Sequence, residues 1–311
     1  MSAVLTITLN PAVDIYSSVP RLAPVQKLRC STERRDPGGG GVNVARVIAR
    51  LGGDVSALFV AGGPIGDYLK ALVHKEVPQI HVVPIAGITR ESFTVLEEVS
   101  RQEFRFVLPG PVLSYQEFEA CLAAVSEAAR PDYMVASGSL PPGAPADAYA
   151  RLASLAKEQG IRFVLDASGD ALRHALDEGV HLVKPNVGEL QEALHTPLSC
   201  TDDIVDAARS VIDSGKAEIV VVTRGPEGAV MVTRDSAWAG EAIRAPVVSS
   251  VGAGDSFLAA LVWSLARGDV GETALRYGLA AGAAALLQPG TTLCQKTDVL
   301  SLAQLVTTRR L

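Results

Sequence analysis

VGAGDSF, at Val251–Phe257, places two glycines and a carboxylate where an extended segment gives way to a helix. After it, apolar residues recur along one helical face, namely Phe257, Leu258, Leu261, Val262 and Leu265. The first N–H groups of a helix have no partner within it, and glycine lets an anion approach the backbone closely. Gly252 and Gly254 therefore predict an anion-binding turn at a strand-to-helix junction, a feature of α/β folds.

Asp255 lies in the first turn of this predicted helix. A carboxylate there can accept a proton from a hydroxyl group, while the backbone of Gly252, Ala253 and Gly254 stabilises charge on a phosphoryl group in transfer. Acidic residues also favour the first turn of any helix, where they offset its dipole. The residues alone leave both roles open.

Strand-like and helical segments alternate along most of the chain. Predicted strands are Val4–Leu9, Val55–Ala61, Tyr133–Ala136, Arg162–Asp166, His181–Val183, Glu218–Thr223 and Val230–Thr233, with a further extended run toward Val248. One predicted helix begins at Val42. The others span Gly66–Val77, Gln116–Ala129, Ala146–Gln159, Asp203–Ser214, Gly254–Arg267, Gly271–Leu287 and Val299–Thr308. This alternation predicts a three-layer α/β sandwich with a mostly parallel central sheet.

Two segments interrupt the alternation. Ile15–Arg35 contains two prolines and has no helical periodicity, and Ser92–Val99 with Glu103–Leu108 has the composition of a hairpin. We expect them to form a small β lid, from inserts at about 15–35 and 88–108, on a single domain spanning residues 1–311. Because small open sheets are rarely stable alone, the lid predicts a homodimer joined through it.

Composition and motif spacing exclude several classes of protein. The net charge of −6 disfavours nucleic acid as a partner, and no apolar stretch is long enough to predict a membrane span. The N-terminus resembles no signal peptide, and four widely spaced cysteines predict free thiols, so we expect a cytoplasmic protein. Asn43 stands where a dinucleotide-binding glycine motif needs its third glycine, and no P-loop motif occurs.

Six blocks resemble the ribokinase family of sugar kinases, in the family's order and over nearly the whole chain. They are PGGGGVNVARVIARLGG at 37–53, SGSLPPG at 137–143, LDASGDAL at 165–172, VKPNVGEL at 183–190, VVVTRGPEGA at 220–229 and VGAGDSF at 251–257. The resemblance implies a ribokinase-like fold, Asp255 as the catalytic base and residues 252–254 as the anion hole.

The resemblance also implies a sugar-binding set. Its members are Asp14, Lys27, Gly38, Gly39, Gly40, Asn43, Arg90 and Ser139. Lys27, Arg90 and Ser139 match positions that face a phosphate already on the sugar, and the fork of arginine suits such a group. Taken singly, these residues are also typical of surface charges, loop residues and tight turns.

A nucleotide-binding set follows from the same resemblance: Lys184, Asn186, Glu189, Thr223, Arg224, Gly225 and Gly228. ATP is the implied phosphoryl donor, and Glu189 is expected to hold Mg²⁺ through water. Arg224 stands where an apolar residue is common in the family. Family members are often activated by a monovalent cation, here K⁺, on backbone oxygens at positions matching Ser249, Val251, Ala285 and Gly290.

Within the family, the glycine run, Lys27–Cys30 and EFRFVLPG at 103–110 resemble the minor bacterial 6-phosphofructokinases. The implied reaction is ATP-dependent phosphorylation of fructose 6-phosphate at its 1-hydroxyl group, giving fructose 1,6-bisphosphate. Tagatose-6-phosphate kinases and 1-phosphofructokinases share TLNPAVD and remain alternatives. A sugar-phosphate sensor without catalysis is a rival on the same fold, although a binding protein has no need of a base.

Overall fold

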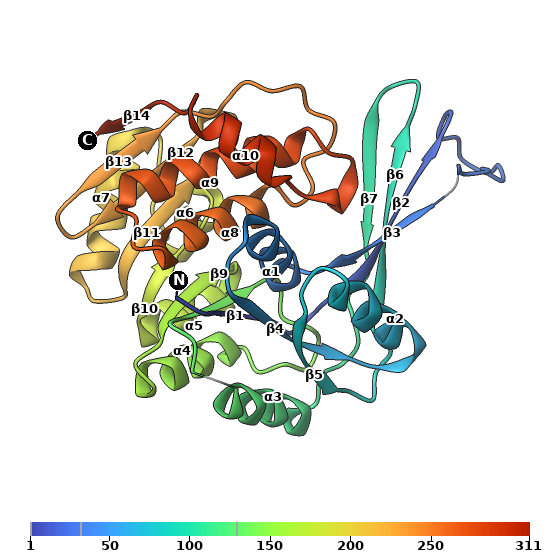
Figure 1. Ribbon diagram of the computed structural model, residues 1–311, viewed down its shortest axis with the longest axis horizontal. Helices are drawn as coiled ribbons and strands as arrows, with labels where there is room; N and C mark the ends of the chain where they lie inside the picture. Colours follow the sequence, from blue (N-terminus) through green and yellow to red (C-terminus); the bar gives the residue numbers. More distant parts are fainter. Residues whose placement is uncertain (1, 32, 129) are drawn as a thin grey trace.

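The computed structural model describes residues 2–31, 33–128 and 130–311, and its main body is a ten-stranded sheet between two layers of helices (Figure 1). The strand order is β14-β13-β12-β11-β10-β9-β8-β1-β4-β5. From β5 to β11 all neighbouring strands are parallel, whereas β12, β13 and β14 are added antiparallel. The strands are β1 (Val4–Thr8), β4 (Val55–Ala61), β5 (Gln79–Pro84), β8 (Tyr133–Ser137), β9 (Arg162–Asp166), β10 (Val180–Val183), β11 (Ala217–Thr223), β12 (Ala229–Thr233), β13 (Ala237–Gly240) and β14 (Thr308–Arg310).

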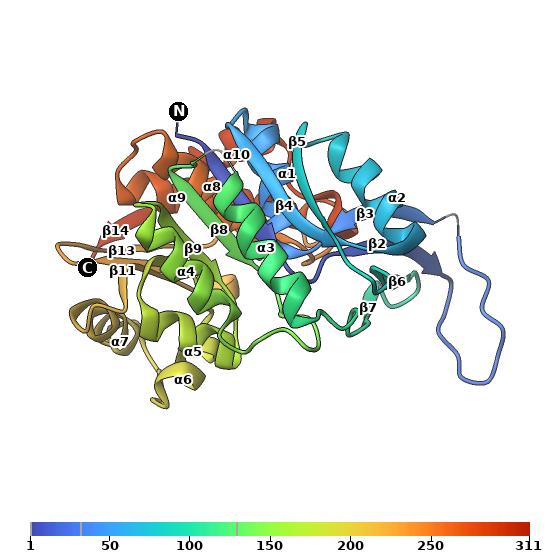
Figure 2. The same cartoon turned by 90° about the horizontal axis from the view of Figure 1, so that it is seen from below.

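Helices cover both faces of this sheet, as Figures 1 and 2 show. One layer contains α1 (Gly40–Leu51), α2 (Gly63–His74), α8 (Ala253–Ala266), α9 (Gly271–Leu286) and α10 (Lys296–Ala303). The other contains α3 (Tyr115–Glu127), α4 (Ala148–Glu158), α5 (Gly169–Glu178), α6 (Val187–Leu194) and α7 (Thr201–Asp213). The predicted three-layer sandwich is confirmed. None of the helices described is both long and apolar enough to cross a bilayer.

Both faces of the central strands are buried, so each strand supplies two hydrophobic cores in alternation. In β4, Ala57 and Phe59 pack with α1, α2 and α8, whereas Leu58 and Val60 pack on the opposite face with α3 and α4. This double burial explains why these strands appear in the sequence as continuous apolar runs.

A second sheet of four strands stands beside the main body, in the order β3-β2-β6-β7. Its strands are β2 (Ala12–Val19), β3 (Arg34–Gly38), β6 (Arg90–Glu97) and β7 (Gln102–Val107). The β2–β6 pair is parallel and the other two pairs are antiparallel. The expected β lid is therefore present. Its strands occupy only the two ends of the insert predicted at 15–35, since the described residues between Pro20 and Glu33 form no strand.

Several predicted segments differ from the structure. Helix α1 begins at Gly40 rather than Val42, because Gly39 adopts φ 107° as its N-cap and the following glycines are already helical. The last predicted helix ends at Ala303, and Thr308–Arg310 instead pairs with β13 as an edge strand. The extended run expected toward Val248 is a strand only at Ala237–Gly240. Strand β5 and helices α5 and α6 were not expected from periodicity.

Candidate active site

A polar cavity of about 350 Å³ lies between the lid and the C-terminal ends of the parallel strands, where α/β folds place ligands. Its walls come from both sheets and from the N-termini of α1 and α8. The lining residues are Ala12, Asp14, Gly39, Gly40, Asn43, Arg90, Ser92, Arg105, Val107, Ser137, Gly138, Ser139, Asp166, Ala167, Ser168, Glu189 and Asp255. The structure thus brings together most of the sugar-binding residues expected from the sequence.

Asp255 lies at the inner end of this cavity, in the first turn of α8. Burial raises the pKa of its carboxyl group from 3.8 to about 6, and the neighbouring Asp166 adds to that shift. A hydrogen bond from Asn43 Nδ2 to Asp255 Oδ2, 2.8 Å long, opposes it. A carboxylate with a pKa near 6 is ionised at pH 7 and is a stronger base than an exposed aspartate.

Helix α8 begins at a sharp turn, in which Gly252 is the N-cap with φ 75°. Its first N–H groups have no acceptor within the helix. Lys184 is buried, and its Nζ lies 3.1 Å from Asp166 Oδ1. A Cβ atom on Gly254 would be 3.9 Å from that Nζ. An ammonium group and the N-terminus of a helix therefore face the same small space beside Asp255, which is suited to an anion.

Neighbouring atoms explain why glycine occupies positions 38 to 40. Gly40 lies so close to β8 that a Cβ atom there would be 2.2 Å from Ser137 Oγ, and Gly39 adopts a φ that favours glycine. Gly38 does not line the cavity. A side chain on Gly38 would collide with the Asp14 carboxylate, so this glycine makes room for a residue that does line it.

Cationic groups of the lid strands line the same cavity, Arg90 from β6 and Arg105 from β7. Arg90 donates from Nη1 to Leu108 O at 2.7 Å and from Nη2 to Asn10 O at 2.9 Å, while its buried Nε has no protein partner. Asn10 also donates from Nδ2 to Ser139 Oγ at 3.2 Å, which leaves the hydroxyl hydrogen of Ser139 available. Asp14 lines the same cavity. Burial raises the pKa of its carboxyl group, although the charge of Arg105 opposes that rise.

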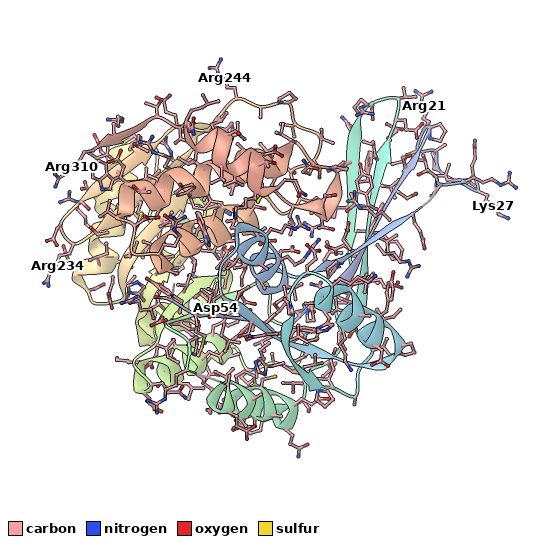
Figure 3. The ribbon with its side chains drawn as sticks, viewed as in Figure 1. Arg21, Lys27, Asp54, Arg234, Arg244 and Arg310 are labelled. Carbon is pink, nitrogen blue, oxygen red and sulfur yellow. The ribbon has the colours of Figure 1, made fainter. Side chains whose placement is uncertain are left out.

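Lys27, like Gly38, is a predicted sugar-binding residue that does not line the cavity of its own chain. It is exposed in the long loop between β2 and β3, and Figure 3 shows its side chain at the far edge of the lid, pointing away from the main body.

Arg105 and Asp166 line the cavity but were not singled out from the sequence. Asp166 stands in the quoted block LDASGDAL, directly at the end of β9, the position at which a parallel strand presents functional groups. Arg105 and Val107 alternate in β7, so they share the face that Arg90 and Ser92 present from β6. Period-two alternation in EFRFVLPG was a signal that could have found Arg105.

A larger and mostly apolar pocket of about 730 Å³ adjoins the other side of the α8 N-terminus. Among its lining residues are Thr223, Gly225, Gly228, Ala253, Gly254, Phe257, Leu279 and Leu286. Gly228 has φ 94°, and a Cβ atom there would be 2.0 Å from Gly240 O, so only glycine fits. Arg224 points elsewhere, donating to Thr201 Oγ1 at 2.8 Å and to Glu227 O at 2.8 Å.

Asn186 and Glu189 form a capping box at the start of α6. Asn186 Oδ1 accepts from Glu189 N at 2.9 Å, and Glu189 Oε2 accepts from Asn186 N at 2.7 Å. Both side chains also border ligand space, Asn186 at the apolar pocket and Glu189 at the polar cavity. The described residues include no cluster of three or more His, Cys, Asp or Glu side chains able to hold a metal alone. A single carboxylate suits Mg²⁺ that arrives with phosphate and water ligands.

The four positions matched to a monovalent-cation site lie just before α8, in the last turn of α9 and in the turn that follows α9. Ser249 N donates to the carbonyl of Leu286, the residue after Ala285, at 3.4 Å, and Val251 N donates to Ser249 Oγ at 3.2 Å. Gly290 follows in the 3₁₀ turn η2 (Gly290–Thr292). Ser249 Oγ also donates to Glu103 Oε2 of the lid at 2.7 Å, so the Glu103 carboxylate lies beside Ser249.

A polar cavity and an apolar pocket that meet at a helix N-terminus, with a buried carboxylate at the junction, define a kinase of small hydroxylated molecules. A model of the pfkB family of carbohydrate kinases matches residues 3–298, and the chain belongs to that family. An ATP-dependent 6-phosphofructokinase isozyme 2 of Mycobacterium tuberculosis is 46% identical over 297 residues, which are 95% of this chain and 87% of the relative.

Solved structures give the same assignment. Crystal structures of the phosphofructokinase-2 from Escherichia coli, at 40% identity, align with TM-scores of 0.94 for a complex with potassium and 0.91 for a complex with fructose-6-phosphate. Both cover 98% of this chain and 99% of the other. A ribokinase of Arabidopsis thaliana, at 20% identity and a TM-score of 0.74 over 98% of this chain and 99% of its own, shares the fold. The expected ribokinase-like fold is confirmed.

Proposed function

We propose that this chain transfers the γ-phosphoryl group of ATP to the 1-hydroxyl group of fructose 6-phosphate, yielding fructose 1,6-bisphosphate and ADP. The observation that carries this proposal is the set of charged groups in one cavity: a base with a pKa of about 6 from the main body and two arginines, Arg90 and Arg105, from the lid. The similarity to ATP-dependent 6-phosphofructokinases supports the same substrate.

Each residue of the junction has a role in this reaction. Asp255 accepts the proton of the 1-hydroxyl group as its oxygen attacks the γ-phosphorus and the bond to the departing ADP oxygen breaks. Backbone N–H groups at Gly252, Ala253 and Gly254, with the ammonium of Lys184, stabilise the charge on the phosphoryl oxygens. Mg²⁺ bound with ATP would supply further charge neutralisation, and Glu189 would hold it through water.

The remaining predicted residues bind the two substrates. Asp14 and the backbone of Gly39 and Gly40 contact the sugar hydroxyls, and Arg90, Arg105 and Ser139 bind its 6-phosphate group. Thr223, Gly225 and Gly228, together with the apolar pocket, hold the nucleotide, and Asn186 lies next to its phosphates. Arg224 is bonded to its own loop and to α7, so we assign it to shaping that loop.

One assay tests the proposal. A coupled assay should show that turnover with fructose 6-phosphate exceeds turnover with fructose 1-phosphate and tagatose 6-phosphate at equal concentrations. Higher kcat/KM for either of the others would assign the chain to that kinase activity instead. No ADP formed from any of the three would favour a sugar-phosphate sensor.

Repeating the assay with K⁺ replaced by Li⁺ tests the proposed cation at Ser249, Val251, Ala285 and Gly290.

We further propose a homodimer joined through the lid. The face of the lid opposite the cavity exposes aromatic side chains, with Phe93 and Phe106 paired across β6 and β7 and Phe104 beside them. Such a cluster is typical of an interface. Lys27 can serve the sugar phosphate only across such an interface, since it lies outside the cavity of its own chain.

Both substrates are cytoplasmic metabolites, which supports a cytoplasmic location.

A further inference from the structure

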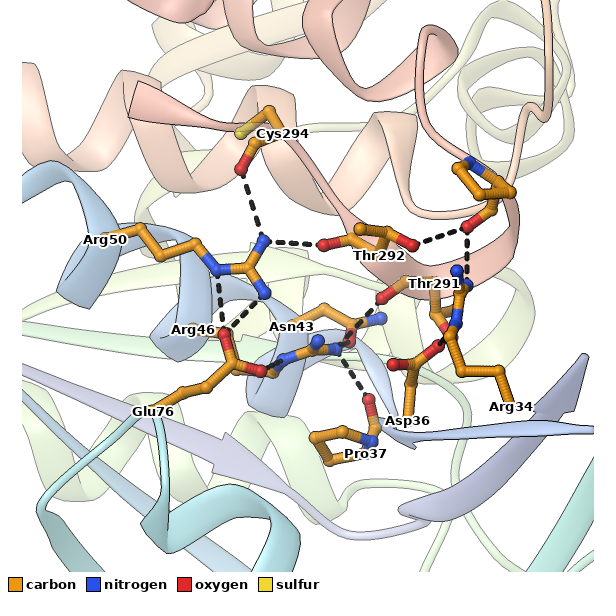
Figure 4. Close-up of polar contacts among 11 residues, drawn as sticks. Arg34, Asp36, Pro37, Asn43, Arg46, Arg50, Glu76, Thr291, Thr292 and Cys294 are labelled. Atoms are coloured by element: carbon orange, nitrogen blue, oxygen red, sulfur yellow. Dashed lines mark hydrogen bonds and ion pairs between the residues drawn. The ribbon is translucent and has the colours of Figure 1, made fainter. Parts of the chain in front are cut away.

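The amide of Asn43 lies between two charged groups of opposite sign, as Figure 4 shows for the arginine side. Arg46 Nη1 is 3.2 Å from one atom of the amide, and Asp255 Oδ2 is 2.8 Å from the other. A guanidinium group can only donate hydrogen bonds, and an ionised carboxylate can only accept them. The oxygen of Asn43 must therefore face Arg46, and its nitrogen must face Asp255.

Arg46 is held in place by groups from separate parts of the chain. It is 1% exposed, and besides Asn43 it donates to Pro37 O at 2.8 Å, to Thr291 O at 3.2 Å and to Glu76 Oε1 at 2.8 Å (Figure 4). Nη1 serves three of these acceptors with two hydrogens, so at least one hydrogen is shared, and moving the side chain would leave polar hydrogens unpaired in the interior at a cost. The side chain consequently has little freedom to move away from Asn43.

Glu76 provides the charge that makes this burial possible. Partial burial raises the pKa of Glu76, but the charges of Arg46 and Arg50 outweigh that effect, so that the net pKa lies below its usual value. Arg50 Nε donates to Glu76 Oε2 at 2.7 Å, and Arg50 also reaches Thr292 O and Cys294 O. Arg46 and Arg50 thus both bind the Glu76 carboxylate, and both donate to backbone carbonyls of the segment 291–294. The contact with Asn43 is made by Arg46.

We propose that Arg46 is a positioning residue for phosphoryl transfer: it fixes the amide of Asn43 so that Nδ2 donates to the Asp255 carboxylate. Without that constraint the amide can rotate about χ2 and turn its oxygen toward Asp255, where two acceptors repel each other. The inference rests on the proposed role of Asp255 as the base. It assigns a task to the largest of the fully buried side chains described, which does not line the cavity.

The direction of the effect follows from the groups around Asp255. Asp166 at the end of β9 raises its pKa, whereas Asn43 on α1, Lys184 after β10 and Arg105 on β7 lower it. Loss of the Asn43 hydrogen bond removes one stabilising contact from the ionised form. The pKa of Asp255 then rises, and the acid limb of the kcat/KM profile moves to higher pH.

Four variants test this inference. Arg46→Lys keeps a positive charge for Glu76 but loses the fork that reaches Asn43, and Glu76→Gln loosens Arg46 without removing it. Both should lower kcat about tenfold and move the acid limb upward by about one pH unit, the scale of one charge-assisted hydrogen bond. Arg50→Met is the matched control: it loses the same carboxylate and loop contacts, so its Tm should fall while the acid limb stays in place.

The fourth variant is Asn43→Ala, combined with Arg46→Lys in a double-mutant cycle. If Arg46 acts through Asn43, the lysine substitution has no further effect on kcat or on the acid limb in the alanine background. Additive effects, or equal shifts in the Arg46 and Arg50 variants, would overturn the inference and leave Arg46 as a structural residue. An Asp255→Asn variant that retained turnover would instead overturn the proposed function itself.

Discussion

Replacement of Asp255 by asparagine separates its chemical role from the cost of its burial. Asparagine has nearly the same shape and can still accept a hydrogen bond from Asn43 Nδ2, but it can neither ionise nor take a proton from a hydroxyl group. Activity and stability should therefore change in opposite directions. Turnover should fall by roughly 100-fold or more, the usual scale for loss of a general base.

The stability change can be worked out from the pKa. The folded protein holds the Asp255 carboxyl group at a pKa of about 6, against 3.8 for an exposed aspartate, so folding favours its protonated form. Below pH 3.8 both states are protonated and burial of the charge costs nothing. Above pH 6 both are ionised, and the two-unit difference costs about 3 kcal/mol. Asn43, Lys184 and Arg105 already offset part of the desolvation within that figure.

Urea unfolding of wild type and Asp255→Asn measures this cost. The variant should be more stable by about 0.5 kcal/mol at pH 4 and by about 3 kcal/mol at pH 8. The same substitution at Asp54, exposed on the surface (Figure 3), controls for removal of a charge and should give little difference at either pH. A gain that did not vary with pH would refute the reasoning about desolvation. Turnover within a few-fold of wild type would remove Asp255 from the role of base.

Two further outcomes are expected. Arg90→Ala should raise the KM for fructose 6-phosphate about ten- to a hundredfold, because charge-assisted hydrogen bonds to phosphate are lost. Its weak activity with unphosphorylated fructose should stay the same, and equal losses with both sugars would show that Arg90 is structural. Phe106→Asp should convert the dimer to a monomer in sedimentation velocity, whereas aspartate at the exposed Val270 should not. A compact monomer in the wild type would contradict the lid interface.

The layers of the fold could be predicted because each rests on a local pattern. Buried parallel strands produce continuous apolar runs, and amphipathic helices produce spacing of three and four residues. The short elements could not be predicted in this way. Helix α6 has only eight residues and begins at a capping box, Asn186 with Glu189, that the sequence also offers as a nucleotide motif. Strand β14 exists because Trp238–Gly240 offers it an edge to pair with, and that partner lies about 70 residues away in the chain.

The candidate site was predictable where a residue type and a block coincide, as at Asp255, Lys184 and Ser139. Contacts between blocks were not predictable. Asn43 was expected in the sugar-binding set, yet its Oδ1 accepts from Arg46 and its Nδ2 donates to Asp255. Such pairings depend on how α1 and α8 pack, and no spacing within one segment encodes that packing.

The charges of the cavity also explain which end of the sugar is phosphorylated under the proposed function. Asp166, Glu189 and Asp255 reach the cavity from the main body, beside the ammonium of Lys184, while Arg90 and Arg105 reach it from the lid strands β6 and β7. A phosphate dianion on the sugar is attracted to the arginines and repelled by the carboxylates. Fructose 6-phosphate placed in this way presents its opposite end, the 1-hydroxyl group, to Asp255. The reversed orientation would bring the dianion against the base and away from the lid arginines, so the charges of the cavity favour the 1-hydroxyl group as the reacting group.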